Sequence, residues 1–285
     1  MNWIAASMLM FISSIVYYLT IRLGQKRGVT VKEYMAINYP LPALVFFLMI
    51  LWRGSSFAVS FTVIPLILFH GIILEYIGGT LSYKAIHAAP NAGYSLVIQK
   101  SYAIFTSIAA IFLFNAPLPV WKFGTIVMII VFAGILSIDP KGTHKTKSHW
   151  FVLSLIPFLF FGSNSLVSKY AVSIAGTELI VYLFWLFLLM SIITTIDILR
   201  GKHALTFTKS HWKTLALIGV SGTSFYYFKN VAQIAAPNVG YVGAINTASN
   251  AFVALLVAFL YKEHMSWIKF IAVVGVVVGI IFIIL

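Results

Sequence analysis

Three charged side chains lie inside long apolar stretches of the sequence: Glu75, Lys100 and Lys229. A charge at the middle of a bilayer costs at least ~2.5–3.5 kcal/mol, so each of them needs a physical reason. Glu75 lies 13 residues before Ala88, and Lys100 lies 12 residues after it. On two antiparallel helices that rise about 1.5 Å per residue and meet at a turn there, both side chains reach the same depth. The spacing predicts either a structural salt bridge or a functional pair, in which Lys100 meets an anion and Glu75 holds or exchanges a proton.

A second set of polar residues follows helical spacing around Lys229. The residues on this face are Tyr226, Lys229, Asn230 and Gln233, and the next apolar stretch adds Asn246 and Asn250, four residues apart. The stretch after the first turn carries a similar stripe, made of Ser95, Gln99, Tyr102 and Thr106. Such side chains either line a binding cavity or bond neighbouring helices, and each interhelical bond contributes about 0.6 kcal/mol on average.

One seven-residue turn occurs twice. Residues 88–94 read AAPNAGY, and residues 235–241, which lie 147 positions later, read AAPNVGY. Pro and Gly interrupt a helix, and an apolar run restarts directly after each copy. Under the same offset Gln99 corresponds to Asn246 and Lys100 to Thr247, so both halves place polar groups at equivalent positions. Duplicated membrane units of this kind bind solutes where the halves meet.

The composition indicates a membrane protein with many helical spans. Of the 285 residues, 61% are hydrophobic and 9% are charged, with a mean hydropathy of +1.00, whereas a soluble domain carries about 25% charged residues. A helix crosses a bilayer with about 20 apolar residues. We predict ten such segments, at residues 3–21, 34–52, 64–86, 90–114, 120–138, 150–170, 177–199, 212–234, 237–261 and 267–285. The chain has no cysteine, which excludes disulfides, thiol catalysis and thiolate metal sites.

A basic link at residues 139–149 divides the predicted segments into five plus five. The halves are residues 1–138 and 150–285, and an odd number of spans in each half makes them inverted relative to each other. Fourteen of the 19 Lys and Arg residues fall in the odd-numbered links, and three fall in the even-numbered links. Cytoplasmic loops carry the excess of basic residues, so this count places the odd links in the cytoplasm and both termini outside.

Several short motifs follow one another in the second half. They are the turn at residues 235–237, the helix end Tyr261-Lys262-Glu263, the pair Ser266-Trp267, and Gly275 and Gly279 in the last segment. In this order they resemble the EamA-type repeat of the drug/metabolite transporter superfamily. The first half matches at residues 88–90, Gly124 and Gly134, whereas Asn115-Ala116 stands where the Glu would be. The resemblance implies ten helices in two inverted five-helix repeats and transport by alternating access. Relatives are often drawn with cytoplasmic termini, so the opposite orientation stays open.

The expected protein is an all-α secondary transporter of the cell inner (plasma) membrane. It would move a small anionic or zwitterionic metabolite, such as an amino acid or organic acid, because two buried lysines oppose one buried glutamate. The predicted substrate-binding residues are Gln99, Lys100, Tyr102, Trp185, Tyr226, Lys229, Asn230 and Asn246. Glu75 would couple transport to protons, or transport would be facilitative. The alternative is a drug or organic-cation exporter, with Glu75 as counter-ion and Tyr76, Trp185 and Tyr226 in cation–π contact with the solute.

The sequence lacks the motifs of other functional classes. It has no phosphate-binding Gly-Lys-Ser loop, paired-His metal motif or nucleophile elbow, so we expect no catalytic residue, no metal, no cofactor and no enzymatic activity. The expected partners are the lipid bilayer and a small-molecule substrate, without nucleic acid, and the chain would be a monomer or homodimer. Three further residues give weaker signals. His70 is expected to be structural. Asn38 precedes a proline-rich kink, and Asn164 lies in a polar patch.

Overall fold

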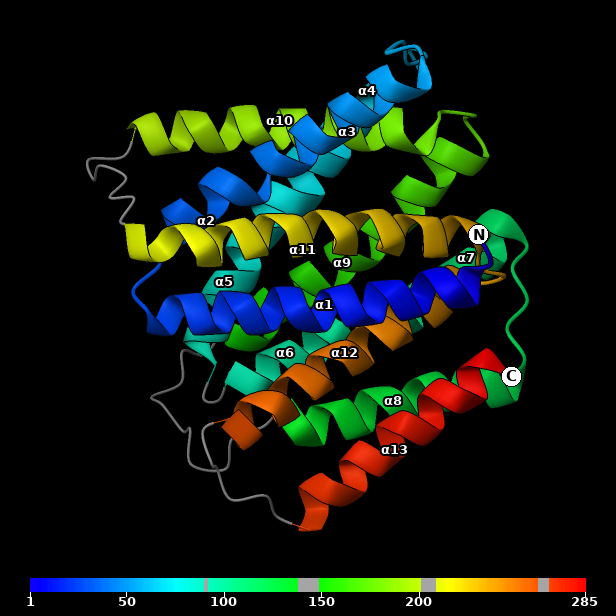
Figure 1. The fold of residues 1–285 in the computed structure, drawn as a ribbon. Coiled ribbons are helices and arrows are strands. Elements are labelled where there is room, and N and C mark those ends of the chain that lie inside the picture. The colour runs from blue at the N-terminus through cyan, green and yellow to red at the C-terminus, as the bar shows by residue number, and fades with distance from the viewer. Residues whose placement is uncertain (90–91, 138–148, 201–208, 261–266) are drawn as a thin grey trace.

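The computed structural model describes residues 1–89, 92–137, 149–200, 209–260 and 267–285. Within these ranges the regular elements are all helices (Figure 1), which confirms the predicted all-α class. In chain order they are α1 (Trp3–Lys26), α2 (Val31–Asn38), α3 (Pro40–Arg53), α4 (Ile64–Leu68), η1 (Phe69–Ile77), α5 (Gly78–Ala88), α6 (Ala92–Lys100), α7 (Tyr102–Phe114), α8 (Val120–Ser137), α9 (Trp150–Ser173), α10 (Leu179–Arg200), α11 (Lys209–Ala235), α12 (Val239–Leu260) and α13 (Trp267–Ile284). Pro90 and Asn91 of the first copied turn, nearly all of the basic link, and Glu263 lie outside the described residues.

Three of the predicted segments are each built from more than one helix. The second consists of α2 and α3, which meet at Tyr39 because Pro40 opens α3 and disfavours helical backbone in the residue before it. This break is the kink expected after Asn38. The third segment consists of α4, η1 and α5, of which η1 is a π-helix. The fourth consists of α6 and α7, which meet at Ser101.

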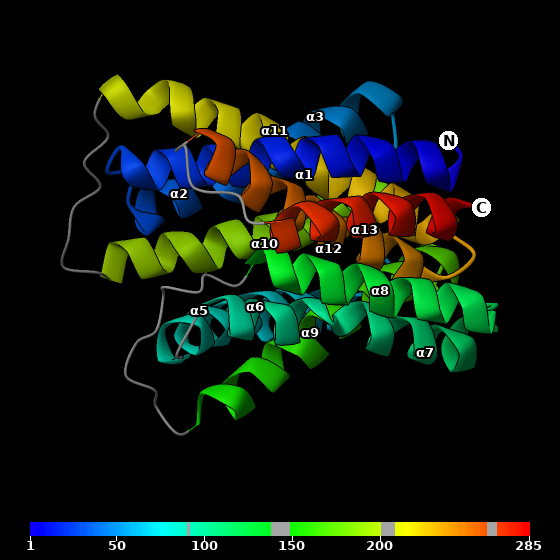
Figure 2. The same cartoon turned by 90° about the horizontal axis from the view of Figure 1, so that it is seen from below.

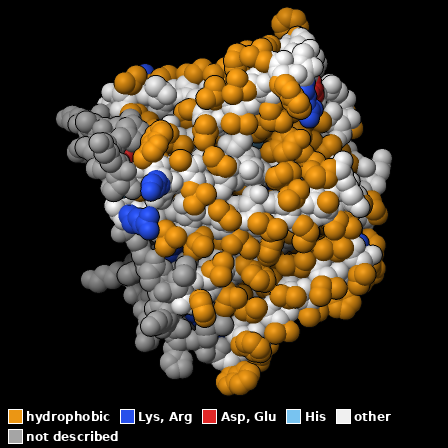
Figure 3. Space-filling model, viewed as in Figure 1, with side chains coloured by type: hydrophobic (Ala, Val, Ile, Leu, Met, Phe, Trp, Pro, Cys, Tyr) orange, Lys and Arg blue, Asp and Glu red, His pale blue; other side chains and the backbone are white. Residues whose placement is uncertain are grey.

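Seven helical stretches of the described chain are long and apolar enough to cross a membrane. They are Trp3–Gly24, Val31–Arg53, Ile64–Ile86, Tyr94–Phe114, Trp150–Ser173, Leu179–Arg200 and Trp267–Ile284. Hydrophobic side chains cover most of the face drawn in Figure 3, and large ones such as Trp52, Phe112 and Trp267 are strongly exposed. Helices with such a surface belong in lipid, so the chain is a multi-pass membrane protein. The count of ten spans stays a prediction.

The helices lie side by side in one bundle and run back and forth across it (Figures 1 and 2). α1 packs along α11 and α12, α5 packs on α9, α3 on α10, α7 on α12, and α8 on α13. Both chain termini lie at the same end of the bundle in the two views. The second copied turn, between α11 and α12, also lies at this end, whereas α5 gives way to α6 at the opposite end.

The second copied turn is fixed by hydrogen bonds to both halves of the chain. The side-chain amide of Asn238 donates to the carbonyl of Ser107 (3.1 Å), and its carbonyl accepts from the backbone N–H of Gly240 (2.9 Å). On the other side, the Lys169 ammonium donates to the Ala236 carbonyl (2.8 Å). These bonds position the start of α12 between α7 and α9.

Candidate functional site

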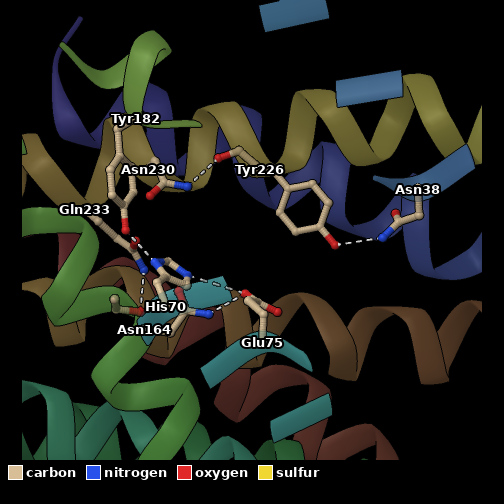
Figure 4. A network of polar contacts seen from close by, with 9 residues as sticks. Asn38, His70, Glu75, Asn164, Tyr182, Tyr226, Asn230 and Gln233 are labelled. Atoms are coloured by element: carbon tan, nitrogen blue, oxygen red, sulfur yellow. Dashed lines mark hydrogen bonds and ion pairs between the residues drawn. The ribbon is translucent and has the colours of Figure 1, made fainter. Parts of the chain in front are cut away.

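Glu75 lies on η1 and faces the second half of the chain. Its carboxylate accepts a hydrogen bond from the side-chain amide of Asn164 on α9, and the Nε2 atom of His70 lies 3.8 Å from it. The side chain keeps 26% of its surface accessible although it lies inside the bundle. Figure 4 shows the carboxylate beside His70 and Asn164, with Tyr226 of α11 across from it. Glu75 is therefore an accessible acceptor held between elements of both halves.

The predicted ion pair between Glu75 and Lys100 does not form. The ion pairs of the described residues are Arg53–Glu178, His70–Glu75 and His211–Glu33. Glu75 and Lys100 face each other at equal depth only on two regular α-helices, whereas η1 is π-helical and packs on α9 and α10. Glu75 consequently turns toward α9, and Lys100 ends α6 next to the break at Ser101.

His70 is held tightly beside Glu75. It is buried, with 2% of its side chain exposed, and its Nδ1 atom lies 2.5 Å from the hydroxyl of Tyr182 on α10. The second ring nitrogen, Nε2, has no hydrogen-bond partner among the described residues and faces Glu75 at the 3.8 Å distance given above. His70 is thus buried and bonded, as expected of a structural histidine, and it also lies beside Glu75. The five-residue spacing of the two gave no signal for an α-helix, because it places them about 140° apart.

Lys100 and Lys229 share the central region with Glu75. Both lysines are partly buried. The charge of Lys229 interacts with both Glu75 and Lys100, and the Lys100 ammonium lies 5.7 Å from the centre of the Tyr18 ring. Two cations and one carboxylate from α6, α11 and η1 therefore form one electrostatic cluster, as the sequence suggested, although not with the predicted pairing.

Next to this cluster, four polar side chains form a hydrogen-bonded network across α1, α2 and α11. The Tyr17 hydroxyl donates to the carbonyl oxygen of Asn38 (2.6 Å) and contacts the hydroxyls of Tyr34 and Tyr226, the latter at 3.2 Å. The Asn38 amide donates to the Tyr226 hydroxyl (3.3 Å). Of these residues, Tyr226 is predicted from the sequence to bind substrate, and Asn38 is predicted to precede the kink. Tyr17 and Tyr34 lack a distinguishing pattern in a chain with 14 tyrosines.

Asn230 and Gln233 present two buried carbonyl oxygens without a partner. The Asn230 amide donates to the Tyr226 carbonyl (2.9 Å), and the Gln233 amide donates to the Ser165 hydroxyl (2.7 Å). Their oxygen atoms, Oδ1 and Oε1, accept no hydrogen bond within the part of the chain that the structure describes. An unpaired buried acceptor costs about 1–3 kcal/mol. This face of α11, which also carries Lys229, therefore has unused hydrogen-bonding capacity. Figure 4 shows Asn230, Gln233 and Tyr226 on the side of Glu75.

Four predicted binding residues have their polar groups engaged elsewhere. Gln99 accepts from Ser82 (2.6 Å) and donates to Ser95 (2.9 Å), in a chain of bonds that joins α5, α6 and α9 through Ser154. The Asn246 amide donates to the buried hydroxyl of Tyr102 (3.1 Å), which joins α12 to α7. The Trp185 indole donates to the Phe57 carbonyl (2.8 Å), within the apolar cluster of α3 and α10.

Comparison with known proteins gives one family and one fold. A family model described as "EamA-like transporter family" matches residues 148–285. A solved structure titled "Crystal structure of protein" aligns with a TM-score of 0.77 over 97% of this chain and 95% of that chain, at 15% sequence identity. At this identity the likeness shows the fold alone. The comparison with curated proteins gave no match.

Proposed function

Because residues 148–285 belong to the EamA-like transporter family of the drug/metabolite transporter superfamily, we propose that the chain is a secondary transporter for a small anionic or zwitterionic metabolite. The observation that carries the proposal is the cluster of Glu75, Lys100 and Lys229, which brings charges from both halves together inside a membrane bundle. Intramembrane charges of this kind are characteristic of solute and ion pathways.

The proposed architecture is ten spans in two inverted repeats, residues 1–138 and 150–285, joined by the basic link. It is supported by packing that repeats under the exchange of the halves. The contact of α1 with α11 corresponds to that of α9 with η1 and α5, and the contact of α1 with α12 corresponds to that of α9 with α6 and α7. The pairs α3–α10, α7–α12 and α8–α13 each join an element to its own counterpart, as a two-fold axis requires.

One hydrogen bond supports the position of that axis. The Thr247 hydroxyl donates to the Lys100 carbonyl at 3.2 Å, and these residues correspond to each other under the 147-residue offset of the copied turns. Two residues related by a two-fold rotation touch each other only close to the axis. Lys100 would then lie where the two repeats meet, which is where duplicated transporters bind their solutes.

The chemistry of the cluster favours a carboxylate on the solute. Lys100 and Lys229 would attract it, and the free acceptors of Asn230 and Gln233 would receive a donor such as an ammonium group. Glu75 would take up or release a proton as the sites are exposed in turn to the two sides of the membrane, or transport would be facilitative. Gln99, Tyr102 and Asn246 would contribute by holding the helices that frame the site, since their polar groups bond other helices.

The second candidate function is export of an organic cation. It is favoured by the tyrosines around Glu75, because Tyr18, Tyr39, Tyr182 and Tyr226 all lie close enough to interact with its charge. The two other aromatic residues expected for this function lie elsewhere: Tyr76 donates to Asp197, and Trp185 bonds Phe57. The lysines of the cluster would repel a cation, so we rank this function second.

The membrane would be the cell inner membrane, with the odd-numbered links in the cytoplasm. The protein would act as a monomer or homodimer, without nucleic acid, cofactor or enzymatic activity.

A thermal-shift screen of the detergent-purified protein against a metabolite library tests the proposal. A ligand at 100 times its Kd stabilises the folded state by about 2.7 kcal/mol. Stabilisation by amino or organic acids that is lost in Lys229→Ala and kept in Lys122→Ala would support the proposal. Lys122 is a matched control because it bonds the Ile283 carbonyl on α13, away from the cluster. Stabilisation by quaternary amines alone would support the cation exporter instead.

A further inference from the structure

The π-helical winding of η1 places His70 and Glu75 on one face. Five residues correspond to about 500° in an α-helix, so the two side chains would point about 140° apart. In a π-helix, where each N–H bonds the carbonyl five residues earlier, residues five apart point only about 50° apart. η1 spans both residues, and their side chains approach to 3.8 Å. The winding of this segment is therefore the reason that the pair exists.

The contact of η1 with α10 fixes the imidazole from the other side. A Cβ atom on Gly71 would lie 2.7 Å from Cδ2 of Leu189 on α10, so a larger residue there would displace the end of the Leu189 side chain at this close contact of the two helices. The approach brings the neighbouring residue, His70, within 2.5 Å of the Tyr182 hydroxyl. With Nδ1 occupied there, the ring has one orientation, in which Nε2 faces Glu75.

We propose that His70 is a positioning residue for Glu75, held by Tyr182 so that its free nitrogen, when protonated, gives the carboxylate a counter-charge within its own half. The distance of 3.8 Å exceeds a hydrogen bond of about 2.7–3.2 Å, so a movement of roughly 1 Å closes the bond. Glu75 thus has one partner on its own helix, His70, and others across the interface, Asn164 and Lys229. If the Glu75 carboxylate exchanges His70 for Asn164 and Lys229, the protonation of Glu75 affects how strongly the two halves of the chain bind each other.

The titratable groups that face this pair come from several elements. They are Tyr182 on α10, Tyr226 and Lys229 on α11, Tyr18 on α1, and Tyr39 between α2 and α3. A pH-dependent effect that requires both His70 and Glu75 therefore reports on this pair.

The test is a double-mutant cycle followed by thermal unfolding in detergent. His70→Gln keeps a hydrogen-bonding group for Tyr182 and removes the charge. It should lower Tm by about 2–4 °C at pH 5, corresponding to about 1 kcal/mol. This loss should shrink as the pH is raised to 8, since only a protonated imidazole supplies the counter-charge. In a Glu75→Gln background His70→Gln should have no pH-dependent effect.

An equal loss at every pH, or the same loss in both backgrounds, would overturn the proposal and leave His70 as a packing residue. His149→Gln, an exposed histidine at the start of α9, is the matched control and should behave like the wild type. If His70→Gln does not fold, Tyr182→Phe replaces it, because it retains the imidazole and removes its anchor. A pH-dependent loss that needs Glu75 would support the proposal, and a pH-independent one would overturn it.

The inference rests on the proposed role of Glu75 in proton coupling, but its test requires no transport. If the cycle shows coupling and no solute is carried, the proposed function fails alone. If transport depends on Glu75 while the cycle shows no coupling, only the role of His70 fails.

Discussion

The side-chain amide of Asn164 on α9 donates a hydrogen bond to the carboxylate of Glu75 on η1, so a residue of the second half binds the deep carboxylate of the first. Asn164 is itself buried, with 4% of its surface exposed. The bond fixes the carboxylate at the boundary between the halves, where α9 packs against η1 and α5. It is one of the direct polar links between the two parts of the chain at the candidate site, together with the contact of His70 with Tyr182.

Asn164→Ala should therefore destabilise the protein. A hydrogen bond to a charged group contributes about 1.5–3 kcal/mol, and removing the donor leaves the carboxylate without it. The measurement is the free energy of unfolding, or Tm in detergent. Ser163→Ala changes the neighbouring residue, whose hydroxyl makes no bond in the described structure, and should shift the free energy by less than about 0.5 kcal/mol. Equal effects of the two substitutions would contradict the assigned bond.

The Tyr17 hydroxyl should contribute more to the free energy of unfolding than the hydroxyl of its neighbour Tyr18. Tyr17→Phe removes contacts to Tyr34, Asn38 and Tyr226 from a buried site and should cost about 1–3 kcal/mol. Tyr18→Phe retains the ring beside the Lys100 ammonium and should cost less than about 0.5 kcal/mol. Thermal unfolding of the two variants measures this difference. A larger loss of Tm for Tyr18→Phe than for Tyr17→Phe would contradict the assignment of Tyr17 to the hydrogen-bonded network.

Gly240 should not tolerate a side chain. A Cβ atom at this position would collide with the Ser107 side chain and lie 2.8 Å from the Ala103 carbonyl of α7. Gly240→Ala should therefore cost about 1–3 kcal/mol, because α12 has to move away from α7. Gly79→Ala, on α5, places its Cβ in open space and should be neutral or stabilising by about 0.5–1 kcal/mol. Similar stability of both variants would argue against the close α7–α12 contact.

The pair of His211 and Glu33 should hold the start of α11 against α2. Glu33 is buried with 1% of its side chain exposed, and the Nδ1 atom of His211 lies 3.1 Å from it. The other ring nitrogen lies 3.1 Å from the Arg27 carbonyl. Breaking a buried pair typically costs about 3–5 kcal/mol, and His211→Ala should approach the lower figure because His211 is partly exposed. His149→Ala serves as the control, and equal Tm values for both variants would contradict this role.

Much of the fold follows from the sequence because each contributing pattern is local. Apolar runs with interruptions define the helices, and Pro40 defines the break between α2 and α3. The polar face of α11 was recognisable because Tyr226, Lys229, Asn230 and Gln233 recur at helical spacing on a regular helix. Lys229 on this face lies close enough for its charge to interact with that of Glu75.

The parts of the site that the sequence missed depend on irregular or distant geometry. No residue in Phe69–Ile77 predicts a π-helix. Spacing on regular α-helices therefore pairs Glu75 with Lys100 and gives no reason to place His70 beside Glu75. Gln99 and Trp185 have the right residue types for binding, but Ser82, Ser95 and the Phe57 carbonyl satisfy their polar groups. Whether a polar side chain faces a cavity or a neighbouring helix depends on the rotation of both helices, which spacing along one of them does not determine.

Uptake by proteoliposomes that contain only the purified protein tests the central claim most directly, with the carboxylate ligand from the thermal-shift screen as substrate. We predict uptake by the wild type and by Lys122→Ala, and a loss of at least about tenfold in Lys229→Ala and in Lys100→Ala, equivalent to about 1.4 kcal/mol. Wild-type rates in both lysine variants would contradict the account, because the charged cluster would then have no part in moving the solute.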